Sequence, residues 1–140
     1  MKKLFITLLS VFALSGVIFA QDAPAPAENK NAPEIVFTET SHDFGTIPFN
    51  GDGTYTFEFK NTGNEPLVLS EVRSSCGCTT PEWPRQPIKK GEKATIKVKY
   101  NTSIMGPFNK SVFVTSNAKT PRIVLSIKGS VANNEKKSNS

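Results

Sequence analysis

The sequence predicts an all-β protein: a single immunoglobulin-like antiparallel β-sandwich of about seven short strands. Two observations predict this fold class. Apolar residues recur at every second position in several segments, the pattern of strands with one buried face, and helix-period stripes are absent from the same region. Turn-forming residues also separate these segments at intervals of about ten residues, as is typical of β-sandwiches.

Each expected strand has its own pattern. In 54–60, Tyr55, Phe57 and Phe59 alternate with polar residues, so they are expected to share the buried face. Segment 94–100 alternates in the same way and leaves a basic outer face, whereas Phe113 in 108–115 is out of phase with its valine neighbours, so both faces of that strand would meet apolar surface. The segments expected to form strands are 35–39, 43–46, 54–60, 67–72, 94–100, 108–115 and 122–131.

Turn chemistry punctuates these segments. Residues 61–65 contain Gly63, which can adopt a positive φ, and Pro66 then opens the next strand at a position where no ladder donor is needed. Residues 89–92 give a second turn signal around Gly91. The order of strands within the sheets does not follow from these signals.

The N-terminus has the pattern of a secretory signal peptide over residues 1–20. Two lysines precede an apolar run that ends at Ala20, so we expect cleavage after Ala20. An uncleaved membrane anchor is the alternative, because the run is close to the minimum length that spans a bilayer. We therefore expect an exported protein, periplasmic or secreted, with membrane contact only if the signal segment is uncleaved.

The flanking segments differ from the domain in composition. Residues 21–33 contain three prolines and no large apolar residue, so we expect a disordered tether. The wholly polar residues 133–140 are expected to form a disordered tail, which leaves 34–132 as the folded domain. The formal net charge of +5 falls by two without the lysines of the signal segment, and so mild a charge gives no support to nucleic-acid binding.

The two cysteines, Cys76 and Cys78, lie one glycine apart in a loop between two expected strands. A disulfide between them would close about the shortest possible loop, so its entropic contribution to stability would be small. Three interpretations stay open: a structural disulfide or quiet thiol pair, a redox-active pair, and a site for a soft metal such as Cu(I) or Zn(II). Ser75, Gly77 and Thr79 are expected to shape this loop, with Gly77 permitting a tight turn.

Few other residues qualify for a site. A closed zinc site needs four ligands, and the additional metal candidates are His42 and Met105, for which a strand-entry position and loop packing are the simpler explanations. Trp83 follows the cysteine loop and is expected to cap the end of the sandwich, with ligand stacking as the alternative. No convergent set of acid, base and nucleophile is evident, so we do not expect an enzyme unless the cysteine pair is redox-active.

Several short strings together resemble the domain-of-unknown-function family 1573, whose members are short exported bacterial proteins. The resemblance covers nearly all of 34–131, and its most specific element is the Cys-Gly-Cys stretch with its flanking serine and threonine. It implies a fold similar to the major-sperm-protein and Hydin-type Ig-like domains, and it implies little about function. The strings that carry it are Asp43-Phe44-Gly45-Thr46-Ile47, Phe57-Glu58-Phe59-Lys60-Asn61-Thr62-Gly63, Pro66-Leu67, Ser75-Cys76-Gly77-Cys78-Thr79, Gly106 with Phe108 and Lys110, Ser116-Asn117 and Ile127-Lys128-Gly129.

Two functional hypotheses follow from the sequence. The first is a small exported module that binds a protein or a cell-envelope component through a strand edge or through the loops at the cysteine end. The second is a thiol redox or copper-binding protein that uses Cys76 and Cys78. The state of the two thiols in the exported protein would discriminate between them.

Overall fold

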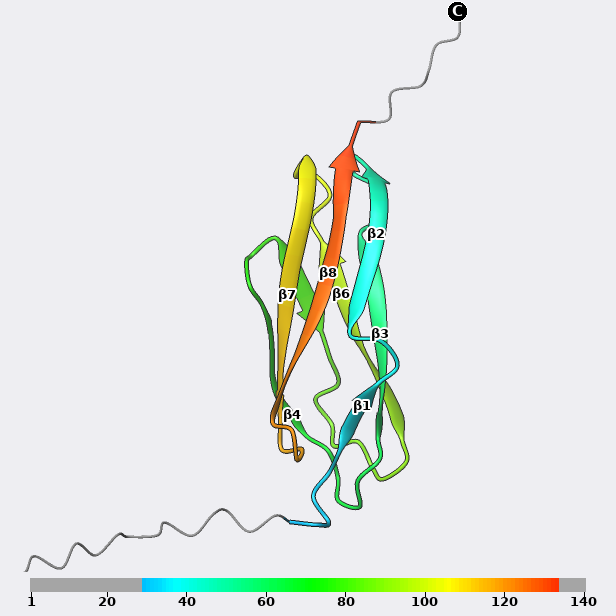
Figure 1. Ribbon diagram of the computed structural model, residues 1–140, viewed down its shortest axis with the longest axis vertical. Coiled ribbons are helices and arrows are strands. Elements are labelled where there is room, and N and C mark those ends of the chain that lie inside the picture. Colours follow the sequence, from blue (N-terminus) through cyan, green and yellow to red (C-terminus); the bar gives the residue numbers. More distant parts are fainter. Residues whose placement is uncertain (1–28, 134–140) are drawn as a thin grey trace, which may run out of the picture.

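The computed structural model describes residues 29–133, which form two β-sheets packed face to face (Figure 1). None of these residues forms a helix. The predicted fold class, a single immunoglobulin-like β-sandwich, is confirmed. The strands are β1 (Ile35–Phe37), β2 (Ser41–Pro48), β3 (Thr54–Asn61), β4 (Leu69–Ser74), β5 (Thr79–Glu82), β6 (Lys93–Tyr100), β7 (Gly106–Ser116) and β8 (Arg122–Ala132).

The strands divide equally between the sheets. Sheet A has the order β1-β3-β6-β5 and is antiparallel throughout. Sheet B has the order β2-β8-β7-β4, in which β2 and β8 run parallel. The parallel pair departs from the antiparallel pattern expected. It arises because the chain changes sheets: the Thr38 N–H donates to the Glu58 carbonyl in sheet A, and two residues later the Thr40 carbonyl accepts from Ser126 in sheet B.

The core lies between the sheets and is built from the period-two residues. Phe57 and Phe59 of β3 are 1% exposed, and Ile96 and Val98 of the neighbouring β6 are fully buried, so the predicted alternation in these two strands is confirmed. Aromatic stacking also joins the sheets, since the Tyr100 ring in sheet A lies 3.8 Å from the Phe108 ring in sheet B. This packing makes the sandwich a rigid support for the loops at its edges.

Strand β5 is the element that the sequence analysis did not expect. It is four residues long, contains Pro81, and pairs with β6 at the edge of sheet A. Proline cannot donate to a ladder, so it is tolerated on such an edge strand. Because β4 lies at the edge of sheet B, the cysteine loop between β4 and β5 carries the chain from one sheet to the other.

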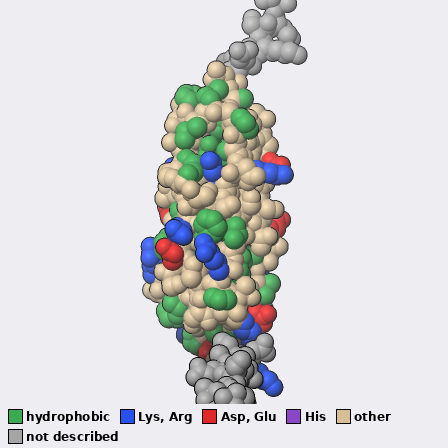
Figure 2. Space-filling model, turned by 60° about the vertical axis from the view of Figure 1, so that its left-hand side comes forward, with side chains coloured by type: hydrophobic (Ala, Val, Ile, Leu, Met, Phe, Trp, Pro, Cys, Tyr) green, Lys and Arg blue, Asp and Glu red, His purple; other side chains and the backbone are tan. Residues whose placement is uncertain are grey.

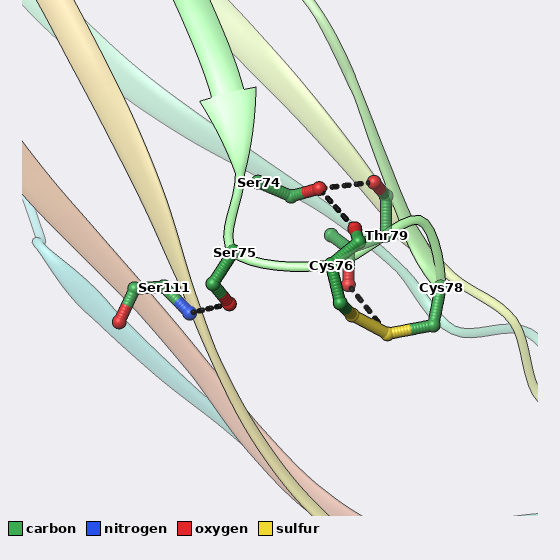
Figure 3. The surroundings of a disulfide bond; sticks show 6 residues. All are labelled: Ser74, Ser75, Cys76, Cys78, Thr79 and Ser111. Carbon is green, nitrogen blue, oxygen red and sulfur yellow. Dashed lines mark hydrogen bonds between the residues drawn. A yellow bond between two sulfur atoms is a disulfide. The ribbon is translucent and has the colours of Figure 1, made fainter.

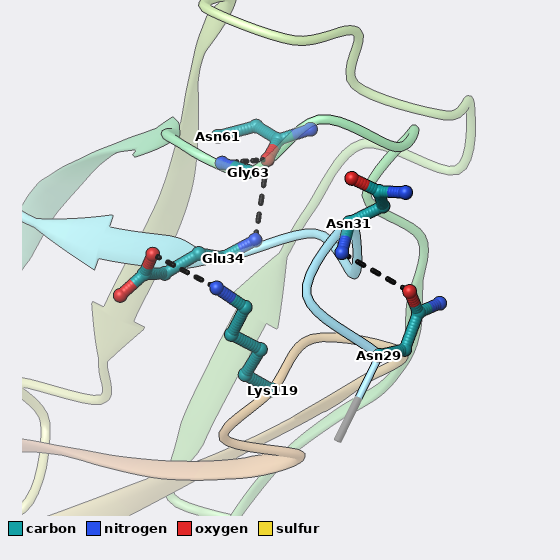
Figure 4. A network of polar contacts seen from close by, with 6 residues as sticks. All are labelled: Asn29, Asn31, Glu34, Asn61, Gly63 and Lys119. Carbon is teal, nitrogen blue, oxygen red and sulfur yellow. Dashed lines mark hydrogen bonds and ion pairs between the residues drawn. The ribbon is translucent and has the colours of Figure 1, made fainter. Parts of the chain in front are cut away.

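The packed part of the chain begins before the expected boundary at residue 34. Asn31 and Pro33 use their carbonyls to accept the backbone N–H groups of Glu65 and Lys119, and a Cβ on Gly63 would collide with the backbone of Ala32 and Pro33. Figure 4 shows this segment lying beside the turn after β3. Residues 29–33 of the expected tether are therefore in contact with the domain.

The expected signal peptide (1–20), residues 21–28 of the expected tether and residues 134–140 of the expected tail lie outside the described residues. Among residues 29–133, no helix is long and apolar enough to cross a membrane.

Candidate functional site

The cysteine loop joins the edge strands of the two sheets, and the structure links its two cysteines by a disulfide (Figure 3). The Cα atoms of Cys76 and Cys78 are 5.4 Å apart, within the ordinary range for a disulfide. The structure therefore presents the pair in its oxidised state, which is compatible with both a structural disulfide and a redox-active pair. The role of this bond is a separate question, which the surroundings of the loop address.

Hydrogen bonds hold the loop on both sides of the disulfide. The Ser74 hydroxyl donates to the carbonyls of Cys76 and Thr79, the latter at 2.7 Å. On the side of sheet B, the Ser75 N–H donates to the Ser111 carbonyl at 2.8 Å, and the Ser111 N–H donates back to the Ser75 hydroxyl at 3.2 Å. On the side of sheet A, the Cys78 carbonyl accepts from Asn101 at 2.8 Å. The loop is thus attached to both sheets through polar contacts.

The cysteine loop lies partly at the surface. Cys76 and Cys78 are both half-buried, and Gly77 between them is exposed. Only Cys78 packs against the hydrophobic core, and its Sγ lies 3.9 Å from the Thr79 hydroxyl oxygen. Thr79 itself is 3% exposed, so it anchors the Cys78 side of the loop. The disulfide accordingly joins two half-buried residues on either side of an exposed glycine.

The first part of β7, before Ser111, has no neighbouring strand among the described residues on the side where β4 pairs with the rest of β7. β4 pairs with β7 only as far as Ser74 and Val112, with one further bond from Ser75 to Ser111. Since Ser111 directs its backbone groups toward β4, Asn109 and Pro107 direct theirs to the same side by strand alternation. The Asn109 N–H and the carbonyls of Asn109 and Pro107 therefore face an open edge, which is clear of other strands in Figure 1.

Exposed apolar side chains lie at the end of the sandwich where β7 begins and β8 ends. Ile104 and Met105 directly precede β7 and are 43% and 47% exposed. Phe49 is 42% exposed, and its N–H donates to the carbonyl of Ala132 at the end of β8. The open edge of β7 thus begins next to exposed apolar side chains, and one of these is the predicted metal candidate Met105.

A second open edge lies on sheet A. β1 borders β3 only down to Phe59, with one further bond from Thr38 to Glu58, so the N–H and carbonyl of Thr56 face outward. A groove of about 190 Å³ runs along this edge and is lined by Thr38, Glu39, Tyr55, Thr56, Phe57 and Glu58. Both sheets therefore leave half of an inner strand unpaired.

His42 lies beside this second edge, away from the cysteine loop. Its ring stacks on Tyr55 at 3.6 Å and meets the edge of the Phe44 ring at 4.6 Å. The Tyr55 hydroxyl donates to Glu39 at 2.8 Å, and this hydrogen bond, with burial and the charge of Glu39, raises the Tyr55 pKa. His42 therefore takes part in an aromatic cluster between β2 and β3, and the structure does not bring it to the cysteines.

Trp83 lies past the end of β5 that is remote from the cysteine loop. The Arg85 guanidinium stacks on its ring at 3.7 Å, and the indole N–H is buried without a partner among the described residues. A shallow groove of about 500 Å³ on the outer face of sheet A also includes Glu82 and Lys97, which form an exposed ion pair at 3.2 Å. Trp83 thus borders sheet A and does not cap the end that holds the disulfide.

The outer face of sheet B carries an aromatic residue between two cations. The guanidinium groups of Arg122 and Arg73 lie 4.8 and 5.9 Å from the Phe113 ring centre, and the paired residue Val124 is 48% exposed. Figure 2 shows the molecule from the side that lies on the left in Figure 1, with hydrophobic side chains next to basic ones. The expectation that this face of the strand meets apolar surface is not met, because two guanidinium groups lie over the Phe113 ring and neither sheet packs against it.

Sequence reasoning missed the backbone site on β7. The expected strand 108–115 excludes Pro107, whereas β7 includes it, and a proline inside a strand marks an edge without a ladder donor. No group of three or more His, Cys, Asp or Glu side chains that could hold a metal ion occurs among residues 29–133. Of the predicted site residues, the structure brings together Ser75, Cys76, Gly77, Cys78 and Thr79.

Comparisons with solved structures place the fold. A protein of unknown function from Porphyromonas gingivalis W83 superposes with a TM-score of 0.67 at 19% identity, covering 75% of this chain and 50% of that one. The ASH / PapD-like domain of human CEP192 gives 0.65 at 10% identity, covering 92% of this chain and all of that one. The YadV chaperone gives 0.50 at 19% identity, with 76% and 55% covered.

At these identities the likeness shows a PapD-like, Ig-type fold and no more. The chain spans about half the length of the Porphyromonas gingivalis protein that it matches. Among proteins with curated functions, none matches the sequence. The family model described as "Protein of unknown function (DUF1573)" matches residues 35–131, so the chain belongs to this family, as its sequence motifs indicated.

Proposed function

We propose that this protein is an exported binding module that adds an extended segment of a partner protein, as an extra strand, to the open edge of β7. The observation that carries the proposal is the unpaired backbone of Asn109 and Pro107 above the cysteine loop. An extended peptide that pairs with such an edge gains main-chain hydrogen bonds, and the side-chain pockets beside the edge select its sequence. Export rests on the signal-peptide pattern of residues 1–20.

The chemistry around the edge defines the partner segment. Ile104 and Met105 offer apolar surface where β7 begins. Lys110 is the only charged residue between Asn101 and Ser111, so a carboxylate in the partner segment would be complementary. The expected partner is therefore an extended segment of a few residues with one or more apolar side chains and an acidic one.

A peptide selection tests the proposal. Peptides selected from a displayed random library against the folded domain are expected to be apolar and acidic, and to bind as strands. In amide hydrogen exchange, the free protein should exchange the Asn109 N–H quickly, because this group has no acceptor within the fold. A bound peptide should slow that exchange by about tenfold or more.

A matched pair of variants controls this test. Asn109→Ala keeps the backbone N–H, whereas Asn109→Pro removes it at an edge that already accommodates Pro107. Binding should survive the first change and fall by about tenfold with the second, since one backbone hydrogen bond and the strand geometry are lost. Peptides that bind both variants equally, or that protect Thr56 on β3 instead, would refute the assignment to β7.

A further inference from the structure

The polar contacts of the cysteine loop make the disulfide unnecessary for holding the loop in place. Ser74, Ser75 and Cys78 each hydrogen-bond to a neighbouring strand or to the loop backbone without involving sulfur. A disulfide that closes a three-residue loop also removes little entropy from the unfolded chain. For both reasons the S–S bond should contribute little to the stability of the fold. A chemical role for the bond therefore has to be considered.

The residue between the cysteines points to the nature of that role. The φ of Gly77 lies outside the left-handed region, and a Cβ placed on it would meet no atom within 4 Å. Neither backbone strain nor packing within the domain therefore requires glycine here. What a glycine does at an exposed loop tip is to leave the disulfide open to a large molecule.

The two sulfur atoms differ in their surroundings. Cys78 packs against the core, and the Asn101 N–H holds its carbonyl. Cys76 does not belong to the core contacts and lies on the other side of the exposed Gly77. The Thr79 hydroxyl, 3.9 Å from the Cys78 Sγ, is placed to donate a hydrogen bond to a thiolate on Cys78. Attack at Cys76 with Cys78 as the leaving group is therefore the favoured direction.

We propose that the Cys76–Cys78 disulfide is a thiol–disulfide exchange site for an exposed dithiol on a partner protein. The partner's thiolate attacks the sulfur of Cys76. Gly77, which has no side chain, leaves room for the partner to approach. This activity goes beyond strand addition on β7 and does not depend on it. It concerns a different set of atoms, the two sulfurs at the loop tip.

A thiolate of the partner attacks the Cys76 Sγ, a mixed disulfide forms, and the S–S bond breaks with its electron pair leaving on the Cys78 Sγ. The second thiolate of the partner then attacks the partner's own sulfur in the mixed disulfide and releases Cys76 as a thiolate. Two electrons pass to this protein, and the partner is left with a disulfide. The partner's two thiols give up their protons, and the two thiolates of this protein take up two from solvent.

Reduction kinetics test the opening at Gly77. Wild type and Gly77→Val are each reduced with reduced thioredoxin, a protein dithiol, and with dithiothreitol, a small one, and thiol formation is followed by alkylation and intact mass. The valine is expected to slow reduction by thioredoxin about tenfold or more and to change the rate with dithiothreitol by less than about threefold, because only the large probe needs the open tip. Gly77→Ala is the milder control, and equal melting temperatures would establish that both variants fold.

Single-cysteine variants test which sulfur reacts. Cys78→Ser leaves the Cys76 thiol, and Cys76→Ser leaves the Cys78 thiol. Compared per thiolate, the Cys76 sulfur should form a mixed disulfide with oxidised thioredoxin about tenfold faster, because Cys78 packs against the core and is less open to a protein partner. Equal slowing of both probes by Gly77→Val would overturn the role of the opening, and a faster Cys78 thiol would overturn the sulfur assignment. Wild type that thioredoxin leaves oxidised while dithiothreitol reduces it would overturn the exchange site, and peptide binding at β7 would be untouched by that result.

Discussion

The side chain of Asn61 is expected to be among the most important polar groups for stability, because it is fully buried and makes four hydrogen bonds. Its oxygen accepts the N–H groups of Glu34 at 3.3 Å and Gly63 at 3.0 Å. Its nitrogen donates to the carbonyls of Glu65 at 2.8 Å and Ile88 at 3.0 Å. The one amide therefore joins the entry to β1, the turn after β3 and the segment before β6, as Figure 4 shows in part.

Asn61→Ala leaves these four backbone groups without their partner. The bonds to Gly63 and Ile88 are buried, so each unsatisfied group should cost about 1 to 3 kcal/mol. The bonds to Glu34 and Glu65 are partly buried, and water can replace the side chain there at a cost of about 0.5 kcal/mol each. We expect a total loss of about 3 to 7 kcal/mol in the free energy of unfolding, measured by urea denaturation.

Asn61→Asp provides the matched control for this estimate. The aspartate keeps the oxygen that faces Glu34 and Gly63 but turns a second oxygen toward the carbonyls of Glu65 and Ile88. Burial and these carbonyls would raise the pKa of the introduced carboxyl, so the variant should gain stability relative to Asn61→Ala as the pH falls and the group becomes protonated. A loss below about 1 kcal/mol for Asn61→Ala would refute the role given to the amide.

Three further outcomes are expected. Removing residues 21–28 should leave the unfolding free energy unchanged. Removing 21–33 should lower it by about 1 to 2 kcal/mol, because the backbone bonds of Asn31 and Pro33 to the domain are lost. Equal effects of the two deletions in urea denaturation would contradict the observed boundary. Replacing both cysteines with serine should cost at most about 2 kcal/mol, with or without reductant, since the closed loop is so short; a larger loss would make the disulfide a structural brace. The hydrogen bond to Glu39 raises the pKa of Tyr55 above its ordinary 10.0. The contribution of this bond to stability is therefore present below pH 10 and is lost as the pH rises through the raised pKa. Tyr55→Phe should abolish that alkaline loss of stability, measured by thermal unfolding across this pH range.

The strands with one buried face could be predicted from the sequence because their side chains carry the signal. Phe57 and Ile96 alternate with charged neighbours, and each is buried as expected. β5 could not be predicted in this way, since its residues Thr79–Glu82 show no alternation and include a proline. Its position depends on pairing with β6, which is a property of the whole sheet.

The candidate site was only partly accessible from sequence for a similar reason. The spacing of Cys76 and Cys78 identified the loop, and the structure adds which sulfur packs on the core. The open edge at Asn109 results from the point at which β4 stops pairing with β7, and composition does not encode that point. The turn chemistry expected at 61–65 accounts for the Asn61 bonds to Gly63 and Glu65. The bonds to Glu34 and Ile88 could not be predicted, because both partners lie 27 residues away in the chain.

The parallel pairing of β2 with β8 has a mechanical consequence. In Figure 1 the chain enters the sandwich at the lower end, before β1, and leaves it at the upper end, after β8, so a pulling force applied through the two ends of the domain acts along the strands. In a parallel pair this direction shears the ladder, and the hydrogen bonds of its two paired stretches, 41–43 and 46–48, resist together instead of opening one after another. A domain held before β1 and pulled beyond β8 would therefore unfold only at a high force. For sheet B to come apart in this direction, β2 and β8 must first slide past each other.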